Sequence, residues 1–138
     1  MKIKTIIIAS LIILVLTGCS NNKLKCTQKS NSTTTNIIAT FSKEGKINTL
    51  EFDRKTIYDK FDAYIDIHYY DLKEQYTSLD NIKGITYEVK ENKNDITTKL
   101  NINYNELPNI DNRLIPIKRN ETIEIAKEKL INEGYICK

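Results

Sequence analysis

The strongest constraint on the fold is an alternation of apolar and polar residues that runs from Ile96 to Tyr104. Ile96, Leu100 and Tyr104 belong to one set of alternate positions, and polar residues such as Lys99 occupy the other set. Successive side chains of a β-strand point to opposite sides, so the pattern predicts a strand with one dry and one wet face. Antiparallel sheets allow this arrangement, because one of their faces can meet solvent.

Shorter alternating runs predict three more strands and place the four strands in two hairpins. The first hairpin joins residues 35–41 to residues 47–52 through a turn at Lys43-Glu44-Gly45-Lys46. The second joins residues 85–89 to residues 96–104. The outward positions of the first hairpin include Glu51 and Asp53, which we expect to be solvated charges and not an acid/base pair.

Apolar residues at steps of three and four predict two helices. One helix spans about residues 59–79 and is ended by Gly84, and the other begins with Asn120 as its cap and is ended by Gly134. The buried stripes are expected at Phe61, Ile65, His68 or Tyr69, Leu72, Tyr76 and Leu79, and at Ile123, Ala126 and Leu130. The predicted order is ββαββα. The fold class is α+β, an antiparallel sheet from two hairpins with both helices on one face.

The N-terminus has the pattern of an export signal. Lys2 and Lys4 precede a charge-free apolar run, Thr5 to Leu16. This run is shorter than the roughly 20 residues that a spanning helix needs. The stretch Leu16-Thr17-Gly18-Cys19 resembles the lipobox of bacterial lipoproteins. This resemblance implies that residues 1–18 are cleaved and that the Cys19 thiol receives diacylglycerol, with further acyl chains such as palmitate.

The lipid implies a membrane location on the extracytoplasmic side, or in an outer membrane where the host has one. Two or three acyl chains are enough for stable anchoring. We expect residues 19–25 to be a polar, lipidated tether and residues 26–138 to be a single domain.

Charge argues against a nucleic-acid partner. The chain has 21 basic and 18 acidic residues, and loss of Lys2 and Lys4 with the signal leaves 19 basic residues against those 18. The sequence contains no basic stripe interleaved with aromatic residues, which a nucleic-acid-binding surface would need.

Cys26 and Cys137 lie near the two ends of the mature chain. In an exported protein we interpret them as a disulfide, which would close a ring of about 110 residues and stabilise the fold by on the order of 4 to 5 kcal/mol. Two independent thiols are the alternative. A zinc or redox pair is less favoured, because there is one histidine and no Cys-x-x-Cys motif.

No catalytic motif stands out, and we predict a protein without enzymatic activity, cofactor or metal. Asp62, Asp66, His68 and Asp71 follow one another on the first predicted helix, but they lack the glycine and the ligand alternation of a calcium loop. A solvated helix face is the simpler interpretation. We expect His68 to be partly buried at the edge of the apolar stripe and Tyr70 to point away from it.

Residues 26–138 resemble the YehR-like lipoproteins, a bacterial family of small domains that follow a lipobox. The stretches that carry the resemblance are "YTSLDNIKGITYEV", "LNINYNEL" and the ending "EGYICK". The resemblance implies an α+β domain on a lipid anchor, and it brings no active residues with it.

Two functions fit these expectations. The favoured hypothesis is a non-enzymatic envelope protein that binds or scaffolds a partner, such as another envelope protein or peptidoglycan. The alternative is a small inhibitor that inserts the segment between Pro108 and Pro116 into an envelope enzyme.

Overall fold

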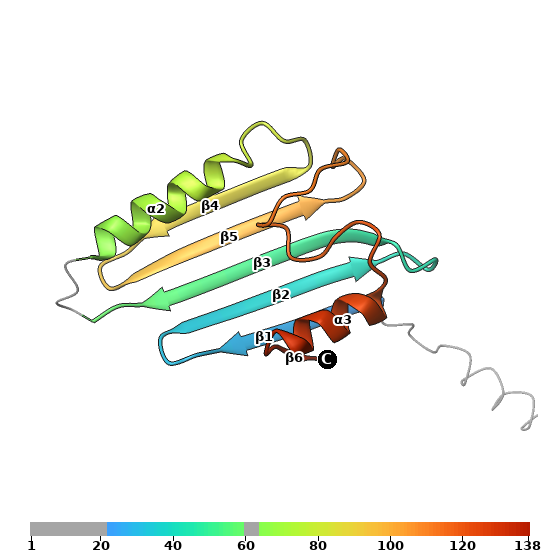
Figure 1. Ribbon diagram of the computed structural model, residues 1–138, viewed down its shortest axis with the longest axis horizontal. Coiled ribbons are helices and arrows are strands. Elements are labelled where there is room, and N and C mark those ends of the chain that lie inside the picture. Colours follow the sequence, from blue (N-terminus) through green and yellow to red (C-terminus); the bar gives the residue numbers. More distant parts are fainter. Residues whose placement is uncertain (1–21, 60–63) are drawn as a thin grey trace, which may run out of the picture.

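The computed structural model describes residues 22–59 and 64–138, and these residues form one sheet with two helices (Figure 1). The α+β class is confirmed. The strands are β1 (Lys23–Lys29), β2 (Thr33–Phe41), β3 (Ile47–Ile57), β4 (Ile85–Glu91), β5 (Asp95–Asn103) and β6 (Ile136–Cys137), and the helices are α2 (Ile65–Thr77) and α3 (Ile123–Asn132).

All neighbouring strands are antiparallel, and their order across the sheet is β4-β5-β3-β2-β1-β6. Both predicted hairpins are present, as β2 with β3 and β4 with β5. The two hairpins join through β3 and β5, where Phe52 lies opposite Leu100. The sheet is therefore continuous from the second hairpin to the C-terminal residues.

The predicted ββαββα order is wrong, because one strand precedes it and another follows it. β1 reads KLKCTQK, and only Leu24 and Cys26 of this strand are buried. Two apolar residues among lysines did not stand out as an alternation. The sheet consequently begins at Lys23, inside the segment 19–25 that we expected to be a tether.

The first helix differs from its prediction at both ends. We expected residues 59–79, whereas α2 begins at Ile65 and its last residue is Thr77, with Ser78 as C-cap. Residues 60–63, including Phe61 of the predicted stripe, lie outside the described residues.

Gly84 does not end α2 but lets two parts of the backbone approach closely. Its φ is +82°, and a Cβ placed on it would lie 2.6 Å from the carbonyl oxygen of Asn103 at the end of β5. A glycine here meets both the steric and the conformational requirement.

The second helix is capped two residues later than predicted. Thr122 is the N-cap of α3, and its hydroxyl accepts a hydrogen bond from the Ile125 N–H at 3.4 Å. Asn120 lies before the cap, because Glu121 folds back to accept from the Lys118 N–H at 2.9 Å. The predicted role of Gly134 is confirmed, since it follows α3 with φ +94°.

One face of the sheet carries the core, and both helices pack on that face. Tyr76 of α2 and Leu130 of α3 belong to the same buried cluster as Ile37, Leu50 and Leu100 from three central strands. In Figure 1, α2 lies along β4, while α3 lies near β1 and β2. We call this side the covered face and the opposite side, which no described helix covers, the open face.

Candidate ligand-binding site

Residues 104–122, the crossing segment, run over the covered face between α2 and α3 (Figure 1). Leu107, Ile115 and Ile117 bury their side chains against the sheet. The Tyr104 hydroxyl at the start of the segment donates to the Ile117 carbonyl near its end, at 2.5 Å, and so ties the two ends together. Burial raises the pKa of Tyr104 far above its ordinary value, so this hydroxyl stays a donor.

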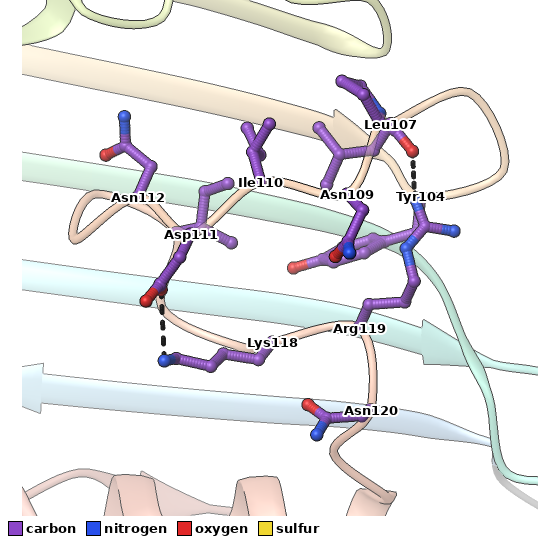
Figure 2. Close-up of a pocket in the computed structure, with 11 residues that line it drawn as sticks. Tyr104, Leu107, Asn109, Ile110, Asp111, Asn112, Lys118, Arg119 and Asn120 are labelled. Atoms are coloured by element: carbon purple, nitrogen blue, oxygen red, sulfur yellow. Dashed lines mark hydrogen bonds and ion pairs between the residues drawn. The ribbon is translucent and has the colours of Figure 1, made fainter.

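The crossing segment encloses a hollow of about 480 Å³, which we call the loop hollow (Figure 2). Figure 2 shows Arg119 reaching the Leu107 carbonyl, to which its guanidinium donates a hydrogen bond. Lys118 forms an ion pair with Asp111 at 3.1 Å, and both side chains are exposed. The cations of this hollow are therefore already matched to oxygen partners.

A second cavity, of about 550 Å³, lies beside the loop hollow between the two helices. We call it the Arg54 cleft, after the residue on its floor. Its lining comes from every layer of the covered side: Phe52 and Arg54 from β3, Tyr76 from α2, residues 111–116 and Lys118 from the crossing segment, Lys129 from α3, and Glu133 and Tyr135 after it. Its volume is in the usual range for small-molecule sites, about 300 to 1,000 Å³.

Arg54 is a half-buried cation that points into the covered side of the sheet. Its Nε donates to the Thr35 hydroxyl at 3.3 Å, and its guanidinium carbon lies 5.3 Å from the centre of the Phe52 ring. Among the described residues no carboxylate lies within 4 Å of its nitrogens, since the ion pairs formed there involve other cations. Partly buried charges in proteins normally have a partner of opposite charge. This guanidinium has no such partner among the described residues, which makes it a candidate for ligand binding.

The two lysines of the cleft are, by contrast, matched. Lys129 contacts both carboxylate oxygens of Glu121 at 2.6 Å, and this pair is partly buried. Lys118 has Asp111 as its partner. Arg113 completes the cationic lining at the exposed rim, where it also borders a hollow that contains the Asp71 and Glu74 carboxylates of α2.

The charge of Arg54 affects the pKa of two tyrosine hydroxyls in the cleft. Burial raises the pKa of Tyr76, and the charge of Arg54 partly offsets that effect. Burial likewise raises the pKa of Tyr135, while the Arg54 guanidinium and the Thr35 hydroxyl act in the opposite direction. Both phenols are therefore neutral at physiological pH and surround the guanidinium without neutralising it.

The predicted disulfide is present between Cys26 and Cys137, which lie directly opposite each other on β1 and β6 with their Cα atoms 4.1 Å apart. Lys25 and Lys138 exchange backbone hydrogen bonds at the neighbouring position, at 3.1 and 2.8 Å. The bond holds β6 on the sheet and thereby fixes Tyr135, two residues earlier, at the wall of the Arg54 cleft.

Other residues singled out from the sequence do not converge on a site. His68 is exposed, contrary to the predicted partial burial, and its ring stacks on Tyr58 with centroids 5.6 Å apart. Tyr70 is exposed, as predicted. No group of three metal-ligating side chains occurs within the described ranges, and Asp62 falls outside them.

The outward charges of the first hairpin behave as expected. Glu51 and Asp53 are exposed on the open face, where neither lines the Arg54 cleft. Cys19 and the predicted signal, residues 1–18, lie outside the described residues.

Sequence analysis did not single out Arg54, although a signal for it exists. In the stretch EFDRKTI, Phe52 is inward and Asp53 outward, so the alternation must turn Arg54 inward. An arginine at an inward strand position, with threonines opposite it on both neighbouring strands, is the pattern that could have located the cleft.

Comparisons with known proteins add no family to this description. No family model matches the chain, and neither the curated proteins nor the solved structures contain a match. In residues 22–59 and 64–138, no helix has the length and apolar character required to span a membrane.

Proposed function

We propose that this chain is a membrane-anchored envelope lipoprotein whose domain binds a small ligand in the Arg54 cleft and does not act as an enzyme. The anchor rests on the lipobox-like stretch that ends at Cys19. The YehR-like resemblance is part of the same proposal and rests on the stretches quoted above. The disulfide between Cys26 and Cys137 supports an oxidising location outside the cytosol.

The observation that carries the binding role is the unpaired Arg54 on the floor of a ligand-sized cavity. A cation that is half-buried and lacks a carboxylate partner lowers the stability of the empty domain. A ligand that supplies the missing negative charge would recover that loss. Natural proteins break local rules of this kind mainly at functional sites.

The packing of the crossing segment favours this role over the inhibitor hypothesis. An inhibitory loop has to project so that an enzyme can take it in. Leu107 and Ile115, at the two ends of the predicted loop, are instead buried on the sheet. Among the exposed residues between them, Asp111 is tied to Lys118. Removing the segment from the sheet would expose part of the core.

Two measurements test the proposal in the native host. Mass spectrometry of the purified protein should find diacylglycerol and acyl mass on Cys19, and Cys19→Ala should leave unprocessed precursor. A photo-reactive amino acid at Arg113, on the rim of the cleft, should label a ligand in intact cells. The same group at Lys93, in the exposed turn between β4 and β5, is the matched control. An unmodified thiol at Cys19 would refute the anchor, and equal labelling at the two positions would refute the site.

A further inference from the structure

We infer that the Arg54 cleft recognises a carboxylate on a small ligand whose body is apolar or aromatic. This inference rests on the proposed binding function and specifies its ligand. The donors, the charge and the walls of the cleft all favour such a ligand.

The donors favour a planar anion. A guanidinium presents a flat fork of N–H groups that matches the two oxygens of a carboxylate. The Nε of Arg54 is engaged by Thr35, and the Phe52 ring holds the guanidinium from one side. The guanidinium also makes a hydrogen-bonding contact with the neutral Tyr135 hydroxyl. Of the described carboxylates none lies within 4 Å of its nitrogens, so its charge is left for a ligand.

The charge favours a monoanion over a phosphate dianion. Five cationic side chains line the Arg54 cleft and the loop hollow together: Arg54, Arg113, Lys118, Arg119 and Lys129. Lys129 is paired with Glu121, and Lys118 is paired with Asp111. The Arg119 guanidinium donates a hydrogen bond to the Leu107 carbonyl. Glu133 also lines the cleft and would repel a second negative charge. Arg113 lies exposed at the rim, where solvent and salt screen its charge. One carboxylate then balances Arg54 without disturbing the existing pairs.

The walls next to the guanidinium favour an apolar body. Phe52 lies on the floor, and Tyr76 and Tyr135 are buried residues that line the same cavity. Aromatic rings offer a large apolar contact area, and their hydroxyls supply hydrogen bonds at its edges. The expected ligand is an aryl or alkyl carboxylic acid, either a free acid or the carboxyl end of a short peptide.

Isothermal titration of the domain with four compounds of similar size tests this inference. The probes are 3-phenylpropionate as a free acid, N-acetyl-phenylalanine as a mimic of a peptide end, N-acetyl-phenylalaninamide as its neutral analogue, and phenyl phosphate as a dianion. We expect at least one of the two acids to bind at least about tenfold more tightly than the amide and the phosphate, because a charge-assisted hydrogen bond from a guanidinium to a carboxylate is stronger than one to a neutral group. Which of the acids binds better distinguishes the two sources.

Variants on the two sides of β3 locate the binding. Arg54→Gln should weaken acid binding by about tenfold or more, and Arg54→Lys should weaken it less, because the charge stays but the fork is lost. Lys55→Gln, at the next residue on the open face, should leave it unchanged. If Arg54→Gln does not fold, the lysine variant and amide shift mapping of the wild-type domain decide the matter. Shifts should then gather at Arg54, Tyr76 and Tyr135.

The outcomes separate this inference from the proposed function. Equal affinity for acid and amide, preference for the phosphate, or no acid binding would overturn the carboxylate assignment. Specific labelling at Arg113 in cells would in that case still support a binding site with another ligand. Absence of labelling together with absence of acid binding would overturn both.

Discussion

The two faces of the sheet treat charge differently, and consecutive residues of β3 show how. Asp53 points to the open face, where Lys99 lies directly opposite it and Glu88 lies opposite Lys99 on the next strand. Arg54 points to the covered face, where its neighbours across the sheet are Thr35 and Thr98. Negative and positive charges alternate on one face, and a single cation stands between hydroxyls on the other.

The charges of the open face are therefore balanced within the sheet, whereas the charge of Arg54 on the covered face is not. Cross-strand pairs of opposite charge are mildly stabilising, so the open face needs nothing beyond solvent. A charge partly removed from water needs a partner, and the described part of the covered face offers none to Arg54. We therefore expect the proposed ligand on the helix-covered side, although the open face is more accessible.

The largest expected effect comes from removing the disulfide that holds β6 at the edge of the sheet. Replacing Cys26 and Cys137 together with serine should lower the free energy of unfolding by on the order of 4 to 5 kcal/mol, because the unfolded chain regains a loop of more than 100 residues. Chemical denaturation measures this loss. Lys25→Ala, on the open face beside Cys26, replaces an exposed side chain as the control and should change stability by no more than about 0.5 kcal/mol. Equal midpoints for the double variant and wild type would show that the bond constrains nothing.

Sequence patterns predicted those features of the two faces that depend on residues close together in the chain or on the number of cysteines. The β4–β5 hairpin was predictable because its alternation is long and unbroken through Leu100. The disulfide was predictable because only two cysteines follow Cys19. β1 was missed because its inward set contains only Leu24 and Cys26, too few to distinguish a strand from a polar linker.

The isolation of Arg54 could not be predicted in the same way. Alternation turns its side chain inward, but its lack of a partner depends on what α2, α3 and the crossing segment bring above it. Those contacts join residues far apart in the sequence, such as Tyr76 and Tyr135, and no local pattern specifies them. The prediction for His68 failed for a related reason, since helical spacing gives a face but not how far the sheet extends beneath it.

A pair of neighbours on β5 tests the contrast between the faces without involving Arg54. Leu100 is fully buried, and Leu100→Ala should lower the free energy of unfolding by about 2 to 5 kcal/mol through lost burial and a residual cavity. Lys99→Ala, one residue away on the open face, removes the cation that faces Asp53 and Glu88 and should lower it by no more than about 1 kcal/mol. Thermal or urea unfolding of the two variants compares them directly. Similar losses would mean that the open face is also packed against something.

A smaller effect should follow from replacing the polar pair beneath the cleft. Arg54→Leu alone removes the hydrogen bond that the buried Thr35 hydroxyl accepts from Arg54 and leaves only its contact with the Tyr135 hydroxyl, so it should cost about 1 kcal/mol of stability. Adding Thr35→Val removes that hydroxyl, and the double variant should be as stable as wild type or more stable, because no charge is left in the cleft. Urea unfolding measures both. A double variant less stable than wild type would show that the Arg54–Thr35 pair itself stabilises the domain, which would remove the observation on which the binding proposal rests.

The smallest effect concerns a second imbalance on the covered side, where Glu91 at the end of β4 lies near Asp66 in the first turn of α2. A hydrogen bond to Asp66 raises the pKa of Glu91, with partial desolvation and the negative charge of Asp66 acting in the same direction. A carboxyl whose pKa is raised by folding stabilises the fold while protonated, and this contribution is lost as the pH rises through the raised pKa. Above that pH the charged form of Glu91 is disfavoured by the negative charge of Asp66 beside it.

Glu91→Gln keeps a donor for Asp66 and removes the second charge. The variant should therefore melt slightly above wild type at about pH 7.5, and the difference should vanish below about pH 4, where wild-type Glu91 carries its proton. Circular dichroism melting curves across this range measure it. Glu88→Gln, on the open face opposite Lys99, is the matched control and should not raise the melting temperature at neutral pH, because it removes a charge that faces an opposite one. If Glu88→Gln stabilised the domain as much as Glu91→Gln, charge balance would not distinguish the two faces.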